Sequence, residues 1–144
     1  MIKIGSYTLI ARVIQAPLVG VSDLAFRLIA REHGVQLCFF EMVDANSLIH
    51  EHTSRSHAIL RTTGKDAPVA AQILGEDPAI MLRSARKLLD IVKPPFLDIN
   101  AACPARKVVK KKAGAHLLLQ PERLFASIRT LASALPVPVT VKLR

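Results

Sequence analysis

Short apolar runs alternate along the chain with longer stretches in which apolar residues recur at helical spacing. We predict that five of these runs are strands: 12–17, 36–43, 68–75, 95–100 and 137–144. Their near-continuous apolar character is typical of parallel strands that are covered on both faces. A short hairpin is also predicted at residues 3–10, with Gly5 and Ser6 at its turn.

The first predicted helix follows the first of these runs. Ser22 is a suitable N-cap for it, and Gly34 is a suitable residue to end it. Leu24, Leu28 and Ile29 fall on one face of the segment. We therefore expect a helix between Ser22 and Gly34.

Two later helices have clear starts. Asp77 can cap one of them, with Pro78 at its first position, and Pro121 opens the other. Residues 45–61 are predicted to form helical pieces within a connection. This alternation of strands and helices predicts parallel strands joined by right-handed crossovers.

Two α/β architectures satisfy that order, an open doubly wound sheet and a (β/α)8 barrel. No glycine-rich phosphate loop follows the first predicted strand, which disfavours a dinucleotide-binding sheet. Barrels bind ligands at the carboxyl ends of their strands. Polar residues stand at these ends in the sequence: Gln15, Glu41, Gln72, Asn100 and Lys142. We therefore predict a partial (β/α)8 TIM barrel that holds five strands and is truncated at the C-terminus.

The composition narrows the class of protein. A length of 144 residues suits one domain, and the 51% apolar content allows a packed core. No apolar run reaches the roughly 20 residues that a membrane span needs, and the first residues lack a signal-peptide pattern. We expect a cytoplasmic protein without a membrane partner. Cys38 and Cys103 are too few for a disulfide framework or a zinc site and are expected to be free thiols.

Positive charge is concentrated in the last third of the chain. The formal net charge is +9, and residues 99–144 hold nine lysines and arginines but one acidic residue. Five of these cations lie between Arg106 and Lys112. A basic surface of this kind attracts polyanions, and nucleic acid is the obvious candidate. A solvated basic face without a partner is the alternative.

Cys103 is the strongest candidate for a catalytic residue. It lies just past a predicted strand end, where a thiol could act as a nucleophile or a general acid. The alternative is a small buried residue, which is how we interpret Cys38. Gln72 could hold a cofactor ring or only satisfy the core, and Lys142 could meet an anion or face solvent. His50, His52 and His57 match no strong ligand motif, so no metal site is predicted.

Four segments, taken in order and with their spacing, resemble the tRNA-dihydrouridine synthase family. They are residues 15–34, 68–81, 97–124 and 137–144. The most specific part runs from Asp98 through Cys103 to Lys107. The resemblance covers nearly the whole chain.

The resemblance implies an FMN-binding (β/α)8 barrel followed by a helical tRNA-binding domain. It implies an NADPH-driven reduction of the C5=C6 bond of a uridine in tRNA. Hydride reaches carbon 6, and Cys103 matches the family's cysteine that protonates carbon 5. The implied cofactor-binding residues are Ala16, Pro17, Leu18, Gln72 and Lys142. The implied substrate-binding residues are Asn100, which orients the uracil, and the phosphate contacts Arg106, Lys107 and Lys110.

The sequence departs from the family pattern at two places. Leu18 stands where the family often has Met, and Ala101–Ala102 stands where it often has Met-Gly. The family's phosphate-binding strands and helical domain are expected beyond Arg144, so we expect this chain alone to be inactive. The full-length protein is expected to be a monomer.

Two other functions remain open at this stage. One is an inactive truncated barrel with weak RNA binding. The other is a different FMN-dependent TIM-barrel oxidoreductase, such as a dihydroorotate dehydrogenase. The second is disfavoured because a small acidic pyrimidine gives the basic stretch after Cys103 no purpose.

Overall fold

The computed structural model describes residues 1–50 and 58–144. An antiparallel hairpin of β1 (Ile2–Ile4) and β2 (Tyr7–Leu9) precedes a parallel sheet. The strands of the sheet are β3 (Cys38–Phe39), β4 (Val43–Asp44), β5 (Val69–Leu74), β6 (Leu97–Ala101) and β7 (Val139–Leu143). The helices are α1 (Leu24–Glu32), α2 (Ala45–His50), α4 (Pro78–Ile91), α5 (Arg106–Lys110) and α6 (Pro121–Ala134), with 3-10 turns η1 (Gly64–Asp66) and η2 (Gly114–Leu119).

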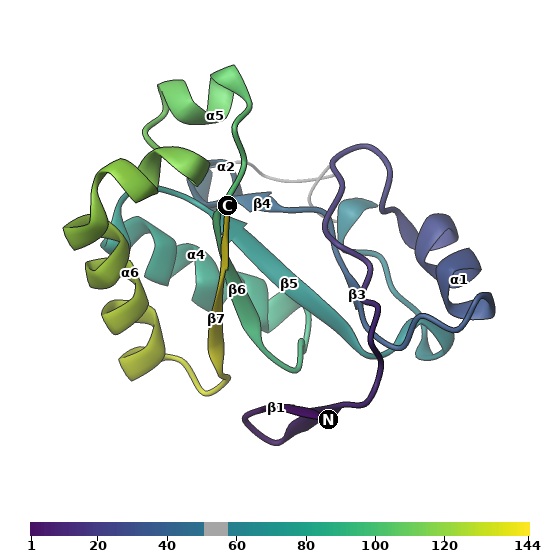
Figure 1. Cartoon of the computed structure of the whole chain (residues 1–144). Coiled ribbons are helices and arrows are strands. Elements are labelled where there is room, and N and C mark those ends of the chain that lie inside the picture. The colour runs from purple at the N-terminus through teal and green to yellow at the C-terminus, as the bar shows by residue number, and fades with distance from the viewer. Residues whose placement is uncertain (51–57) are drawn as a thin grey trace.

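The sheet runs in the order β3-β5-β6-β7, and β4 also pairs with β5. Every pairing within it is parallel, as the alternation of strands and helices predicts. The strands follow one another around a curved arc (Figure 1). The fold is therefore a mixed α/β structure with a mostly parallel sheet, and it is compatible with part of a TIM barrel.

One face of the sheet is apolar and covered by helices. α4 and α6 pack against each other and lie on this face (Figure 1). The shared core takes alternate residues of the strands, such as Ile73 and Ile99, together with Met81, Leu88 and Leu131 from the helices. Burial of these side chains is the main stabilising contribution to the fold.

The other face of the same strands carries polar residues. Gln72, Asp98 and Thr140 are direct neighbours across β5, β6 and β7, and Asn100 and Lys142 form the next pair toward the carboxyl ends. Successive side chains of a strand point to opposite faces. An apolar face and a polar face thus come from the same alternation, and the polar face is the one that a barrel would enclose.

Residues 12–17, predicted as the first strand, do not form one. The Gln15 N–H donates to the Leu37 carbonyl at 3.0 Å, and the Gln15 side chain accepts from the Phe39 N–H at 3.1 Å. The segment therefore runs beside β3 but makes too few ladder bonds to be a strand. Pro17 limits the ladder further because it has no N–H to donate.

Two other predictions need correction, and one helix was not foreseen. The predicted strand 36–43 is two short strands, β3 and β4, both paired with β5. Helix α1 is capped by Asp23, whose side chain accepts from the Phe26 N–H, rather than by Ser22. Ser22 is buried and bonds the Leu18 carbonyl instead. Helix α5 was not predicted.

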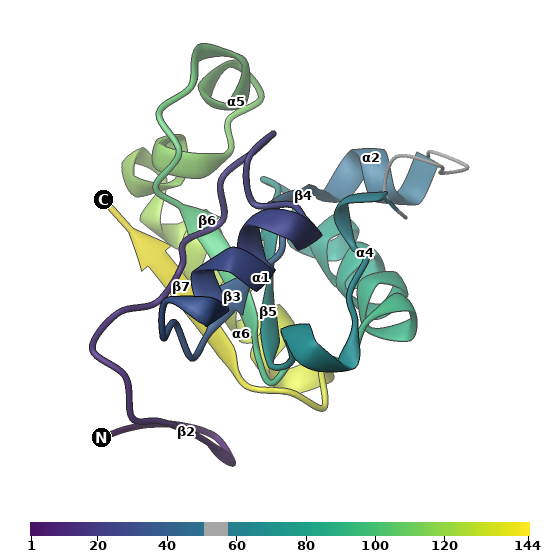
Figure 2. The same cartoon turned by 90° about the vertical axis from the view of Figure 1, so that its right-hand side faces the viewer.

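The N-terminal hairpin lies at the opposite end of the sheet from α5 (Figures 1 and 2). Tyr7 and Phe39 both pack on Phe96 near this end. Gly5, at φ +59°, turns the hairpin so closely over Pro138 that a side chain at position 5 would collide with the proline ring. None of the helices among the described residues is both long and apolar enough to cross a membrane.

Candidate functional site

A cleft of about 550 Å³ opens at the carboxyl ends of β5, β6 and β7. Most of the predicted site residues line it: Pro17, Leu18, Gln72, Asn100, Cys103, Lys107 and Lys142. Ala16 lines a smaller hollow of about 240 Å³ that shares Pro17, Gln72 and Lys142 with the cleft. Arg106 and Lys110 line neither hollow and lie on the exposed surface of α5.

Cys103 is partly buried in the loop that follows β6. Its carbonyl accepts from the Ala115 N–H at 3.0 Å. Gly114, at φ +62°, lies directly behind it, and a Cβ on Gly114 would be 2.6 Å from the Cys103 carbonyl oxygen. The position thus needs glycine both for its backbone angle and for the close approach.

The departure at Ala101–Ala102 does not strain this loop. Among the described residues other than glycine, Lys112 is the one with a positive φ. Ala102 therefore adopts a backbone conformation that alanine allows. Glycine is not required before Cys103 in this chain.

A chain of hydrogen bonds runs from the polar face of the sheet to the backbone of Cys103. The Thr140 hydroxyl donates to Asp98 Oδ1 at 2.6 Å, and Gln72 Nε2 donates to Asp98 Oδ2 at 2.6 Å. Asn100 Nδ2 donates to Gln72 Oε1 at 2.8 Å. Asn100 Oδ1 then accepts from the N–H groups that follow it, Ala102 at 3.1 Å and Cys103 at 2.9 Å.

Asp98 is the buried charge of this network. Burial raises its pKa above the ordinary value of 3.8, while the hydrogen bonds from Thr140 and Gln72 and the charge of Lys142 act in the opposite direction. Asp98 is 5% exposed and Gln72 is fully buried. A buried carboxylate whose two oxygens both accept hydrogen bonds indicates a built polar site rather than an accidental one.

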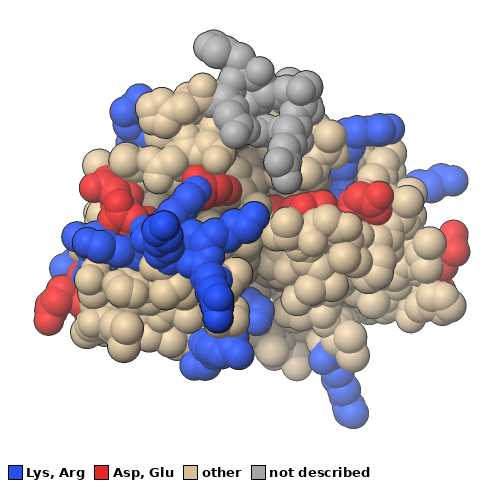
Figure 3. Space-filling view, turned by 90° about the horizontal axis from the view of Figure 1, so that it is seen from above, with Lys and Arg blue, Asp and Glu red and all other residues tan. Residues whose placement is uncertain are grey.

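A basic surface stands beside the cleft. Five exposed cations lie on and just after α5: Arg106, Lys107, Lys110, Lys111 and Lys112. Seen from the α5 side, lysines and arginines gather over this part of the molecule (Figure 3). Most of the charge excess predicted from the sequence is therefore placed next to Cys103.

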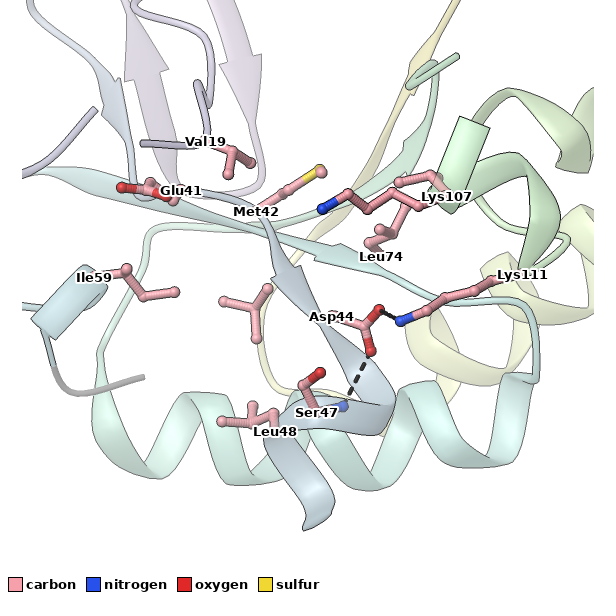
Figure 4. A pocket seen from close by; sticks show the side chains of 12 residues that line it. Val19, Glu41, Met42, Asp44, Ser47, Leu48, Ile59, Leu74, Lys107 and Lys111 are labelled. Carbon is pink, nitrogen blue, oxygen red and sulfur yellow. Dashed lines mark hydrogen bonds and ion pairs between the residues drawn. The ribbon is translucent and has the colours of Figure 1, made fainter. Parts of the chain in front are cut away.

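A second hollow of about 340 Å³ separates α5 from β4 and α2. Lys107 reaches into it from α5 and also lines the cleft (Figure 4). Lys111 Nζ bonds Asp44 Oδ2 at 2.8 Å, and Asp44 Oδ1 accepts from the Ser47 N–H at 3.0 Å. This ion pair ties the basic helix to the sheet.

The histidines that the structure describes form no cluster at this site. His50 is exposed at the end of α2, and His52 and His57 lie outside the described residues. Among residues 1–50 and 58–144, no group of three or more His, Cys, Asp or Glu side chains is arranged to hold a metal ion.

Sequence reasoning missed three residues of the site. Asp98 and Thr140 anchor the hydrogen-bond chain, and Met42 places its sulfur 3.3 Å from Asn100 Nδ2. The sequence did contain a signal for Asp98, because a carboxylate inside the apolar run 95–100 must find hydrogen-bond partners. Thr140 and Met42 had none, since the partners they contact lie in distant parts of the sequence.

Comparison with known proteins places the chain in one family. The sequence model of the family described as dihydrouridine synthase (Dus) matches residues 14–144. A probable tRNA-dihydrouridine synthase of Treponema pallidum is 35% identical over 148 residues, covering 99% of this chain and 43% of the relative. The tRNA-dihydrouridine synthase B of Pseudomonas aeruginosa is 38% identical over 144 residues, covering all of this chain and 43% of the relative.

A probable tRNA-dihydrouridine synthase of Synechocystis is 37% identical, and this chain covers 40% of its length. The chain therefore spans less than half the length of these curated relatives. The match extends across the cleft residues, the Cys103 loop and the basic helix, and it agrees with the resemblance seen in the sequence. The chain belongs to the dihydrouridine synthase family.

Proposed function

We propose that this chain forms part of an FMN-dependent, NADPH-driven tRNA-dihydrouridine synthase, with Cys103 as its proton donor. The observation that carries the proposal is the position of Cys103 in the same cleft as Gln72, Asn100 and Lys142. Family membership supports the reaction class, because the relatives are named for it. The basic surface on α5 supports an RNA substrate.

The residues of the cleft suit the ring of a flavin. Pro17 and Leu18 offer an apolar surface, and apolar contacts dominate most cofactor sites. Gln72 uses one amide hydrogen on Asp98 and keeps a second one for a ligand. Lys142 adds a cation beside the cleft. In the proposal, these four residues and Ala16 hold the FMN ring, which when bound supplies the hydride to carbon 6 of the uridine.

Asn100 orients the uracil in the proposed reaction. Asn100 lines the cleft, and its carbonyl is committed to the backbone of Ala102 and Cys103, so its amino group is the part left for a ligand. One amino hydrogen is bonded to Gln72, and the other points at the Met42 sulfur, a weak acceptor. A uracil carbonyl is a stronger acceptor and would replace that contact.

The proton step belongs to Cys103. As carbon 6 gains hydride, negative charge develops at carbon 5, and the Cys103 thiol donates its proton there. The thiolate that remains takes a proton from solvent before the next turnover. Phosphates on either side of the target uridine meet Arg106, Lys107 and Lys110, which position the strand without reading its sequence. The uridine leaves its stack to enter the cleft.

The test replaces Cys103 by Ala in the organism that carries the gene, at the chromosomal position. Dihydrouridine in purified tRNA is then measured by mass spectrometry. We expect one dihydrouridine position to be lost, because a missing general acid costs about 10²–10⁴ in rate.

Cys38→Ala is the matched control. Cys38 is fully buried in β3 and away from the cleft, so its replacement should leave dihydrouridine unchanged. Unchanged dihydrouridine in the Cys103→Ala strain would refute the proposed role of the thiol.

A further inference from the structure

Asp98 has no role in the proposed reaction, yet it hydrogen-bonds Gln72, which does. It does not line the cleft that holds Cys103, although it lines the smaller hollow beside Gln72 and Lys142. Its hydrogen bonds reach the Cys103 backbone through Gln72 and Asn100. The two amides in between can each be placed in two orientations, because the oxygen and nitrogen ends have similar shapes. Something must select one orientation of each.

The carboxylate makes that selection at one end of the chain, and the Ala102 and Cys103 N–H groups favour the same direction at the other end. An ionised carboxylate only accepts hydrogen bonds, so Gln72 must turn its amino group toward Asp98. The Gln72 carbonyl then faces Asn100, which must answer with its own amino group. This leaves the Asn100 carbonyl facing the N–H groups of Ala102 and Cys103. The reverse orientation would oppose the Asn100 amino group to two backbone donors.

We propose that Asp98 is a positioning residue, whose carboxylate, held by Thr140, sets the direction of both amides and so clamps the backbone that aims the Cys103 thiol into the cleft. Its importance for dihydrouridine formation rests on the proposed function, whereas the clamp itself does not. The register supports the assignment, because Gln72, Asp98 and Thr140 are direct neighbours on three adjacent strands. Strand positions fix side chains more tightly than loop positions do.

Amide hydrogen exchange in the full chain tests the clamp without any activity assay. The readout is the exchange rate of the Ala102 and Cys103 N–H groups relative to the Leu97 N–H on the same strand, which donates to the Pro138 carbonyl. Global unfolding exposes all three groups together, so a rise in this ratio reports local opening of the loop and not a general loss of stability. In Asp98→Asn we expect the ratio to rise about tenfold, because the amide at position 98 no longer enforces one direction.

Ile99→Val is the matched control for destabilisation. Ile99 neighbours Asp98 on β6 but belongs to the apolar cluster on the other face, so the ratio should stay at its wild-type value. Thr140 provides a second pair of variants in case Asp98→Asn fails to fold. Thr140→Val removes the hydroxyl and should raise the ratio several-fold, and Thr140→Ser keeps the hydroxyl and should not.

A variant in which the residues at positions 98 and 100 are swapped tests whether the direction of the two amides matters. In the double variant Asp98→Asn/Asn100→Asp, the new carboxylate accepts from both backbone N–H groups and from a Gln72 whose amide has reversed. The chain is again consistent from end to end, so we expect the ratio to return to within about threefold of wild type. Asp98→Asn with an unchanged ratio, or a double variant no better than Asp98→Asn, would overturn the proposal.

These outcomes are separable from those of the proposed function. If Cys103→Ala leaves dihydrouridine intact while Asp98→Asn loosens the loop, the function fails and the clamp stands. If Cys103→Ala abolishes dihydrouridine while the exchange ratio is insensitive to Asp98, the function stands and the clamp fails.

Discussion

Arg27 illustrates how a single residue can contradict the pattern around it. Apolar periodicity in α1 pointed to Leu24, Leu28 and Ile29, yet the side chain that α1 buries completely is Arg27, and Ile29 is 56% exposed. The Arg27 guanidinium bonds Asp66 Oδ2 through Nε at 3.0 Å and Nη2 at 2.8 Å. It also lies over the Phe40 ring, 4.8 Å from the centroid.

This pair predicts a large effect of one substitution. Asp66→Ala leaves Arg27 charged and buried without its partner, and we expect a loss of about 3 kcal/mol in the free energy of unfolding. Urea denaturation of the full chain measures it. Asp90→Ala removes an exposed carboxylate from α4 and serves as the control. A loss no larger than that of the control would mean that water or another group compensates Arg27.

Asp44 predicts a dependence of stability on pH. Burial would raise its pKa, but the hydrogen bonds from Lys111 and the Ser47 N–H, with the charge of Lys111, outweigh burial and lower the pKa below 3.8. The unfolded chain therefore binds more protons between the lowered value and 3.8, so the stabilisation is complete above pH 3.8 and lost as pH falls through the lowered pKa.

Measurement of urea unfolding against pH checks this sign. The free energy of unfolding of the wild type should exceed that of Asp44→Asn by about 0.5 kcal/mol at pH 6. The difference is small because Lys111 is largely exposed and exposed ion pairs are weak. The difference should shrink at pH values below 3.8. A difference that grows on acidification would contradict the assigned direction.

At the scale of elements, the strands and long helices were predictable because their signals are local. β5, β6, β7, α4 and α6 follow from apolar runs and from the caps Asp77, Pro78 and Pro121. The predicted strand 12–17 failed because its pairing depends on Leu37 and Phe39, which sequence spacing does not reveal. Helix α5 was not predicted because its residues are mostly charged and it buries only Val108, so it shows no apolar periodicity.

The candidate site was also predictable only in part: most of its residues could be named from the sequence, but the hydrogen bonds between them could not. Cys103, Asn100, Gln72 and Lys142 stand at strand ends, and parallel strands bring their carboxyl ends to one edge. The bonds that join these residues could not be foreseen, because each depends on the register of two strands. The roles of all the predicted site residues, Cys103 included, remain predictions, as do FMN, NADPH and the cytoplasmic location.

Replacement of Gly114, the first residue of η2, is predicted to disturb the Cys103 loop. Gly114→Ala places a methyl group against the Cys103 carbonyl at a backbone angle that alanine disfavours. We expect the loop to shift, with a loss of about 2 kcal/mol in unfolding free energy and a several-fold change in the alkylation rate of Cys103.

Gly34→Ala separates strain from collision. Gly34 also has a positive φ, at +87°, but nothing lies within 4 Å of the Cβ that would be added. It should destabilise the chain by about 1 kcal/mol without altering Cys103 alkylation. Equal alkylation rates in both variants would show that Gly114 does not support the loop.

At the scale of the whole molecule, positive charge is concentrated at one end of the fold as well as in one part of the sequence. Arg106 and Lys110 are exposed on α5, which stands at the end of the molecule that carries the cleft. Each phosphate that a cation neutralises adds about 0.9 to the slope of log binding constant against log salt. The double variant Arg106→Gln/Lys110→Gln should therefore bind tRNA with a slope that is shallower by up to about 2.

Filter retention of tRNA between 50 and 200 mM KCl measures the slope. Lys93→Gln is the matched control, because Lys93 is an exposed cation in the turn that enters β6 from the other end. A loss of slope that is equal in the control would indicate general attraction to a basic protein and not a phosphate track along α5.

The hairpin at the far end of the sheet has a practical consequence. Met1 is 89% exposed and begins the hairpin, whose turn at Gly5 is held against Pro138, while the cleft and α5 stand at the other end (Figure 1). A biotin or an affinity handle joined to the first residue would therefore anchor the molecule to a sensor with its cationic helix directed into the flowing sample. Kinetics of polynucleotide capture could then be recorded without the anchor masking the surface under study.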